Sequence, residues 1–217
     1  MESLVRIRAA RWADKDLVAL LITEALHPTP LAGWLVPDPR QRCQVLADVV
    51  AIWVEHAMFF GDIHLTADLT AATVGFHRYR PIPPPANYRT RLTDAAGPHA
   101  DRFDLLDTLL AEKQPTEPHY HLAFLAVRPD AQRGGCGAAL LAHHRSRLDR
   151  IDLPSWTAVP SGGEHLLARY GYTPRPAMTL PDGPTMQPMR RSAPHGSSVM
   201  PINPARPVDN RWQDFHG

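Results

Sequence analysis

Residues 119–148, HYHLAFLAVRPDAQRGGCGAALLAHHRSRL, decide the fold of this chain. The apolar run Leu122–Val127 is short and is followed closely by a proline, which is typical of a buried strand. Residues 128–130 predict a turn, and Leu141 and Leu148, seven positions apart, predict one apolar face of a helix. The stretch therefore predicts a strand, a glycine-containing loop and a helix, in that order.

The loop between this strand and this helix, Gln132–Gly137, has the composition of an anion-binding loop. The first backbone N–H groups of a helix have no intrahelical acceptor, and the helix dipole adds positive potential there. Glycines let the chain curve until those N–H groups converge on a ligand, and Arg133 adds a cation beside them. The loop therefore predicts a site for a phosphate or a pyrophosphate.

Two common nucleotide-binding motifs do not fit this loop. A P-loop needs Lys and then Ser or Thr after its last glycine, whereas Gly137 is followed by two alanines. The dinucleotide-binding fingerprint needs a third glycine, which is also absent after Gly137. A purely structural turn between strand and helix remains the alternative to a ligand site.

The pattern that remains is Q-x-x-G-x-G-A at 132–138, after a strand that ends in V-x-P-D. It resembles motif A of the GCN5-related N-acetyltransferases, which binds acyl-CoA. Downstream, Ala168–Tyr172 looks like the final helix of that family and its Gly-aromatic close. The segment Leu180–Pro184, followed by Met189, is similar to puromycin-type antibiotic acetyltransferases. The resemblance covers residues 4–191.

The resemblance implies an α/β fold with a central mixed, mostly antiparallel β-sheet that is splayed between two parallel strands and flanked by helices. Residues 1–191 are expected to form this acyltransferase domain, with Ser155–Val159 as the strand parallel to Leu122–Val127. Residues 192–217 are rich in proline and polar residues and predict a flexible C-terminal tail. Further helices are predicted at 15–26, 39–60, 88–95, 100–113 and 162–170, and further strands at 4–10, 63–66, 73–80, 173–180 and 185–190.

The same resemblance implies acetyl-CoA as co-substrate, no metal, and a small-molecule amine, antibiotic-like or biosynthetic, as acceptor. In the family a bulge in the motif A strand splays it from its parallel neighbour, and a backbone N–H of the strand polarises the thioester carbonyl. The segment Leu31–Pro39 is expected over the acceptor cleft. Contacts to the pantetheine arm are expected from Leu125, Ala126 and Val127. Contacts to the pyrophosphate are expected from Gln132, Arg133, Gly134, Gly135, Cys136, Gly137 and Ala138.

The usual proton donor of the family has no counterpart here. Related enzymes carry a Tyr on the last helix, four residues before the Gly of the Gly-aromatic pair, and that position is Leu167. The polar residue that commonly precedes the Tyr by about one turn is replaced by Gly163. Tyr170, three residues after Leu167, is therefore the predicted catalytic substitute, with a packing role as the alternative.

His121 is the predicted general base. It lies on the predicted central strand two residues after His119, so that both side chains project to one face. A His with a pKa near neutral suits removal of a proton from an ammonium group. The pair could also bind zinc, but the sequence places no third ligand, and a structural role is the remaining alternative. His143 and His144, on the following helix, are expected to be solvated.

Two other functions follow from the missing Tyr. One is a degenerate relative that binds acyl-CoA or a small ligand for sensing or sequestration, without turnover. The other is different chemistry on a natural product, because one fold can host several reactions.

Composition limits the partners and the compartment. The 217 residues carry a formal net charge of +1, which gives no overall field for nucleic acid or a membrane surface. The first residues do not resemble a signal peptide, and Val45–Phe60 is interrupted by ionisable residues, so no transmembrane helix is predicted. Cys43 and Cys136 lie far apart, which favours free thiols in a reducing cytoplasm. A homodimer is left open.

Overall fold

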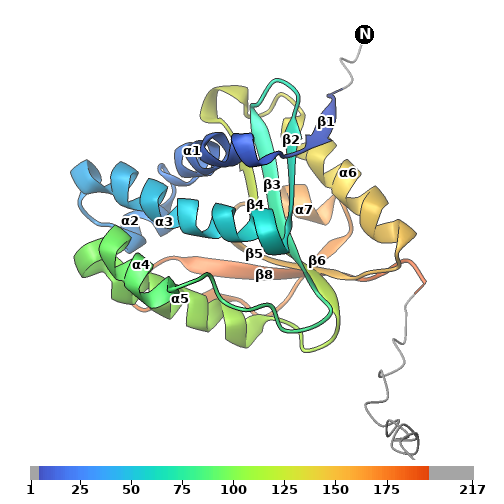
Figure 1. Cartoon of the computed structure of the whole chain (residues 1–217). Helices are drawn as coiled ribbons and strands as arrows, with labels where there is room; N and C mark the ends of the chain where they lie inside the picture. Colours follow the sequence, from blue (N-terminus) through green and yellow to red (C-terminus); the bar gives the residue numbers. More distant parts are fainter. Residues whose placement is uncertain (1–4, 196–217) are drawn as a thin grey trace, which may run out of the picture.

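The computed structural model describes residues 5–195, which form one mixed sheet flanked by helices (Figure 1). The strand order is β1-β2-β3-β4-β5-β8-β6, and β7 pairs with β8. The strand pairs are antiparallel except β4 with β5, which is parallel. The predicted fold class and the predicted parallel pair are therefore confirmed. The strands are β1 (Ile7–Ala9), β2 (Asp62–Thr66), β3 (Ala71–Arg78), β4 (His119–Val127), β5 (Ser155–Pro160), β6 (Tyr172–Pro174), β7 (Met178–Thr179) and β8 (Thr185–Arg191).

The helices are α1 (Lys15–Leu26), α2 (Pro30–Leu35), α3 (Pro39–Phe60), α4 (Tyr88–Ala96), α5 (Ala100–Lys113), α6 (Cys136–Arg150) and α7 (Glu164–Ala168), with short 3-10 turns at Trp12–Asp14, Gly97–His99 and Pro129–Ala131. The bounds of α1, α3 and α5 are those that the sequence predicts. α7 is shorter than the predicted helix at 162–170, and α2 is a helix that the sequence analysis does not predict. From residue 196 onwards, the predicted tail lies outside the described residues.

Local signals fix the ends of α3. Its first residue is Pro39, whose missing N–H is not needed there, and the Asp38 carboxylate accepts a hydrogen bond from the Arg40 N–H at 2.9 Å. The helix ends at Phe60, before Gly61. By length and apolar composition α3 is the one helix within residues 5–195 that could also span a membrane. Its buried residues pack on α1 and on the sheet, as those of a core helix do.

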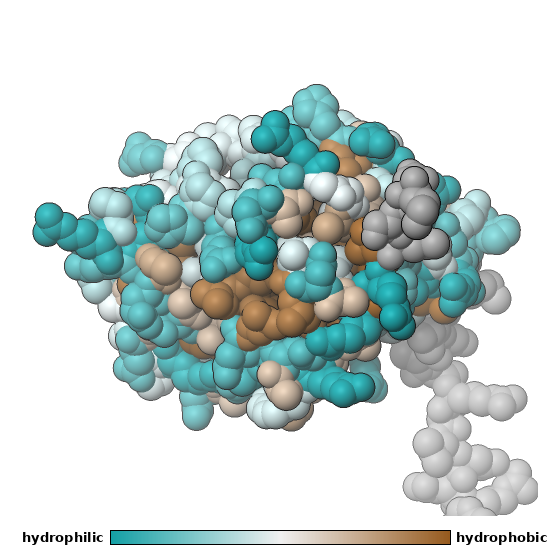
Figure 2. Space-filling view, turned by 90° about the horizontal axis from the view of Figure 1, so that it is seen from above, coloured by the Kyte–Doolittle hydropathy of each residue, from teal (hydrophilic) through white to brown (hydrophobic). Residues whose placement is uncertain are grey.

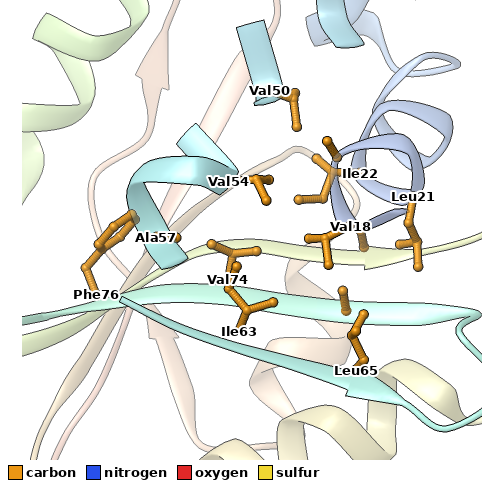
Figure 3. Close-up of a cluster of buried hydrophobic side chains, with 13 residues drawn as sticks. Val18, Leu21, Ile22, Val50, Val54, Ala57, Ile63, Leu65, Val74 and Phe76 are labelled. Carbon is orange, nitrogen blue, oxygen red and sulfur yellow. The ribbon is translucent and has the colours of Figure 1, made fainter. Parts of the chain in front are cut away.

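One face of the sheet is covered by α1 and α3. Figure 3 shows Val18 and Ile22 of α1 close to Val54 of α3 and Val74 of β3, in a cluster whose members are almost fully buried. Burial of each such side chain contributes about 1.5–3 kcal/mol. Ala126 of β4 belongs to the same cluster, so this packing holds the central strands in place.

The other face of the sheet is covered by α6 and α7. Leu141 and Leu148 of α6 pack with Leu122 of β4 and Leu167 of α7. The seven-residue spacing that predicted an apolar helix face is therefore confirmed. The face of the molecule in Figure 2 is mostly hydrophilic, with one area near its middle where apolar side chains gather.

Residues 79–118 lie between β3 and β4, although these two strands are neighbours in the sheet. The segment contains α4 and α5, which form a separate apolar cluster with α2, α3 and the C-terminal hairpin. Leu92 of α4 and Phe103 of α5 are buried in this cluster beside Met178 of β7. These helices extend the core on the α3 side of the sheet.

Candidate functional site

The candidate site begins where β4 and β5 separate. Their parallel pairing covers only Tyr120 with Ser155 and His121 with Trp156, although β4 continues to Val127. Beyond His121, the edge of β4 that faces β5 has no partner strand within the described residues. Its main-chain N–H and C=O groups are therefore available to a ligand.

A β-bulge accompanies this separation. Val74 of β3 pairs with Phe124, but the next residue of β3, Gly75, pairs with Leu122, so Ala123 has no partner on β3. An extra residue of this kind bends its strand and increases the local twist. The bulge that the family resemblance implies is therefore present, two residues after the last pair between β4 and β5.

The residues predicted to contact a pantetheine arm, Leu125, Ala126 and Val127, lie along the free edge of β4. On the opposite edge they are paired with β3, which fixes their backbone. Ala126 is buried in the core, so its side chain is not open to a ligand. An extended ligand with amide groups could add to this edge as a strand does, through main-chain hydrogen bonds.

The glycine loop leads from β4 into α6. Arg133 and Gly135 have positive φ angles of 64° and 87°, which turn the chain toward the start of α6. The first hydrogen bond of the helix runs from the Ala139 N–H to the Gly135 carbonyl at 2.9 Å. The N–H groups of residues 136–138 therefore have no backbone acceptor among the described residues, and this arrangement suits an anion.

One hydrogen bond ties the glycine loop to the end of β4, and another joins it to the 3-10 turn at Pro129–Ala131. The Gln132 side chain donates from Nε2 to the Val127 carbonyl at 3.3 Å, and the Gly134 N–H donates to the Ala131 carbonyl at 3.3 Å. The Arg133 side chain is exposed, so it can approach a bound anion.

Gly137 and Cys136 contribute to the loop in different ways. A Cβ on Gly137 would lie 3.3 Å from Val127 Cγ2 and 3.4 Å from Leu166 Cδ2, so glycine lets α6 approach both β4 and α7. The Cys136 side chain is buried, and its Sγ lies 3.5 Å from Thr70 Oγ1. Its thiol points into the core, and only its backbone N–H is left for a ligand.

His121 lies at the point of separation, on the face of the sheet that α3 covers. Its ring centroid is 6.4 Å from that of Phe76 and 5.0 Å from that of Trp156. Burial, together with the nearby charges of Arg78 and His119, lowers the pKa of His121 to about 3. The ring is therefore neutral at neutral pH and is a weak base.

Tyr170 lies on the opposite face of the sheet. It packs with the α6 cluster and lines a hollow of about 300 Å³ with Arg145, Asp149 and Arg191. Arg145 and Asp149 belong to the C-terminal half of α6, whereas the glycine loop precedes the N-terminus of that helix. The structure does not bring Tyr170 and His121 together.

Leu167 occupies the usual Tyr position and is part of the core. Its side chain is 2% exposed and packs in the cluster of Leu122 and Leu141. It has no proton to donate to the leaving group. Gly163 lies just before α7, where an added Cβ would be 3.3 Å from Val159 Cβ.

The segment Leu31–Pro39 packs against α4 and α5, and its position over an acceptor cleft stays a prediction. Leu31, Trp34 and Leu35 are buried in the cluster with α4 and α5. Trp34 Nε1 donates a hydrogen bond to the Pro181 carbonyl at 2.8 Å, which ties the segment to the C-terminal hairpin.

The prediction that His144 is solvated is wrong. Its side chain is 4% exposed, and Nε2 lies 3.0 Å from the Tyr172 hydroxyl and 3.3 Å from Ser155 Oγ. This network joins α6 to β5 and β6. One signal was present in the sequence, because His144 falls between Leu141 and Leu148 on the buried stripe of the helix.

The structure adds no third ligand to His119 and His121. Within residues 5–195, no group of three or more His, Cys, Asp or Glu side chains is placed to hold a metal ion. His119 instead directs Nδ1 to the Glu117 carbonyl at 2.8 Å.

No protein-family model and no curated protein matches the sequence. Solved structures do match. A histone acetyltransferase HPA2-related acetyltransferase from Corynebacterium glutamicum superposes with a TM-score of 0.69 at 20% identity, over 88% of this chain and 98% of that chain. A putative acetyltransferase of the GNAT family from Desulfovibrio desulfuricans superposes with a TM-score of 0.53 at 16% identity, over 87% of this chain and 98% of that chain. Arylalkylamine N-acetyltransferase 2 from Aedes aegypti superposes with a TM-score of 0.59 at 11% identity, over 88% of this chain and 99% of that chain. The chain therefore has the fold of the GNAT acetyltransferases.

Proposed function

We propose that the protein is an N-acetyltransferase that moves an acetyl group from acetyl-CoA directly to the amine of a small molecule, antibiotic-like or biosynthetic. The observation that carries this proposal is that the free edge of β4 leads into the unpaired N–H groups at the start of α6. Acetyl-CoA offers a diphosphate for those N–H groups and an extended arm with amides for the strand edge. The resemblance of residues 180–189 to puromycin-type enzymes supports a small acceptor.

Each part of the cofactor has a place in this arrangement. The diphosphate would bind the N–H groups of residues 136–138, with Arg133 beside them. The pantetheine arm would run along residues 125–127. The thioester would then lie near the bulge at Ala123, where a backbone N–H could donate to its carbonyl oxygen.

The reaction needs one bond exchange and two proton movements. The amine nitrogen attacks the thioester carbonyl carbon, and the C–S bond breaks. The amine loses a proton, for which His121 is the predicted acceptor even though its lowered pKa makes it a weak base, and the CoA sulfur gains one. Because Leu167 cannot supply that proton, water does so, and holding the reactants together provides most of the acceleration.

Acetyl-CoA titration by calorimetry and a thiol-release assay over a panel of small amines test the proposal. We expect binding, and release of CoA with at least one amine. His121→Asn should lower kcat by about 100-fold if His121 is the base. Tyr170→Phe tests the other predicted residue, and its position on the far face of the sheet predicts little change.

The buried Leu167 favours a second candidate, a protein that binds without turnover. Equal affinity for acetylated and free CoA, with no CoA released from any amine, would support sensing or sequestration and contradict the enzyme. We also propose a cytoplasmic location, because the exposed Cys43 and the buried Cys136 are both free thiols.

A further inference from the structure

Arg78, the last residue of β3, is a half-buried cation whose side chain has no acidic partner within residues 5–195. Its Nε is buried without a hydrogen-bond acceptor, and its Cζ lies 5.6 Å from the centroid of the Phe76 ring. Two other half-buried arginines have acidic partners, since Arg91 binds Glu55 and Arg147 binds Asp62. An unpaired guanidinium that has lost part of its water is costly, and a bound anion would offset that cost.

Two histidines share this face with Arg78. Arg78 pairs with His119 across β3 and β4, and Phe76 pairs with His121, so all four side chains project to the same side of the sheet. His119 Nε2 and His121 Nδ1 are buried and have no hydrogen-bond partner among the described residues. We call Arg78, His119 and His121 the Arg78 cluster.

The Arg78 cluster carries net positive charge at neutral pH. Burial, reinforced by the charge of Arg78, lowers the pKa of both His121 and the neighbouring His56. Burial also lowers the pKa of His119, against its hydrogen bond to the Glu117 carbonyl. The Glu117 carboxylate is exposed and lies 4.0 Å from Arg190, and it forms no ion pair with Arg78. The histidines are neutral, and the guanidinium charge remains.

The cluster lies next to the place where the thioester is expected. His121 forms the last pair with β5, and the bulge at Ala123 follows two residues later, which is about 7 Å along a strand. The guanidinium lies over Phe76, the cross-strand partner of His121, so it is also near this point. A small molecule could reach the thioester with one group and Arg78 with another.

We infer that the Arg78 cluster binds the carboxylate of the acceptor, so that the acceptors are small amines that also carry a carboxylate, as amino acids do. This inference rests on the proposed acetyl transfer and narrows its substrate class.

A binding experiment tests the site without any turnover. The probes are a series of N-acetyl amino acids with small to aromatic side chains, each compared with its carboxamide, added to the full chain with CoA present. We expect the acids to shift the ring signals of His119 and His121 in NMR spectra and to bind about ten- to hundred-fold more tightly than the amides. Equal binding of acids and amides, or no shift at either ring with any probe, would overturn the inference.

Three variants locate the effect. Arg78→Met keeps an apolar stem over Phe76 and should remove the preference for acids, whereas Arg78→Lys should restore part of it. Arg80→Met, at an exposed position two residues further on, is the matched control and should leave the preference unchanged. A preference that survives Arg78→Met in a folded protein, as judged by circular dichroism, would place the carboxylate elsewhere.

Steady-state rates separate this inference from the proposed function. Amino acids should show a kcat/KM about ten- to hundred-fold above that of their amides, with acetyl-CoA affinity the same in Arg78→Met and wild type. Equal kcat/KM values for acids and amides would contradict the carboxylate site but would not contradict the proposed acetyltransferase activity. Selective binding of acids without release of CoA from any amine would support the anion site and contradict the acetyltransferase.

Discussion

Gly135 and Gly171 provide a matched pair of substitutions. Both have a φ of +87°, a Cβ on Gly135 would meet nothing within 4 Å, and a Cβ on Gly171 would meet only Arg191, at 3.9 Å. A side chain in this left-handed region costs about 1–2 kcal/mol. Alanine therefore introduces the same strain at both positions, but only Gly135 belongs to the glycine loop.

We expect the strain to lower stability in Gly171→Ala and to weaken acetyl-CoA binding in Gly135→Ala. Gly171→Ala should lower the free energy of unfolding by about 1–2 kcal/mol, and Tm by about 2–8 °C for a chain of this size, without changing the Kd for acetyl-CoA. In Gly135→Ala the free loop can relax out of the left-handed region, and binding must then restore it. The same 1–2 kcal/mol would weaken binding by about 5- to 30-fold, with a smaller fall in Tm.

Thermal unfolding followed by circular dichroism and calorimetric titration with acetyl-CoA give the two quantities. If the loop stays rigid, the added methyl group stands beside the unpaired N–H groups, and affinity still falls. Wild-type affinity in Gly135→Ala, with the same loss of Tm as in Gly171→Ala, would refute the assignment of the diphosphate to this loop.

Three further predictions concern stability. Leu167→Ala should lower the free energy of unfolding, measured in urea, by about 2–5 kcal/mol. A change under about 0.5 kcal/mol, which is typical of a substitution on the surface, would contradict the place of Leu167 in the core. Burial raises the pKa of Asp62, but hydrogen bonds from His77 and Arg147, each 2.8 Å, outweigh it and hold the pKa below its usual range. Asp62→Asn should therefore cost about 2 kcal/mol at pH 7, and the difference should shrink as the pH falls below about 4. Burial keeps His64, His121 and His144 neutral, with pKa values lowered to about 4, about 3 and about 3. In the unfolded chain these histidines bind protons below about pH 6.5. The free energy of unfolding should therefore be greatest above that pH and should fall toward pH 4, by up to ~1.4 kcal/mol per pH unit for each residue. Urea midpoints that stay constant from pH 7 to 5 would argue against this.

Local signals explain what could be predicted of the fold. Pro39 and Gly61 mark the ends of α3, and the apolar run before Pro129 marks the central strand. The glycine loop was predictable because its signal lies within one short stretch. α2 was missed because six residues are too few for a periodic pattern, although Thr29 before Pro30 is a helix-start signal, and the Thr29 hydroxyl does accept a hydrogen bond from Ala32 N–H.

Contacts between distant parts of the chain explain what could not be predicted. His144 is buried because Tyr172 and Ser155, on two strands, meet it across the helix. The lack of an acidic partner for Arg78 among residues 5–195 depends on which side chains surround β3 once the sheet has formed. The places of His121 and Tyr170 on opposite faces follow from the sheet, and no spacing in the sequence encodes that separation.

The pairing of β8 sets an order for folding during synthesis on the ribosome. β8 is the last strand within residues 5–195, yet it pairs with β5, β6 and β7. Until residues 185–191 emerge from the exit tunnel, β5 lacks its long antiparallel neighbour and is joined to β4 at only its first residues. A nascent chain that pauses before residue 185 would expose this strand edge to chaperones, and the gap between β4 and β5 would take its shape only after β8 has joined the sheet.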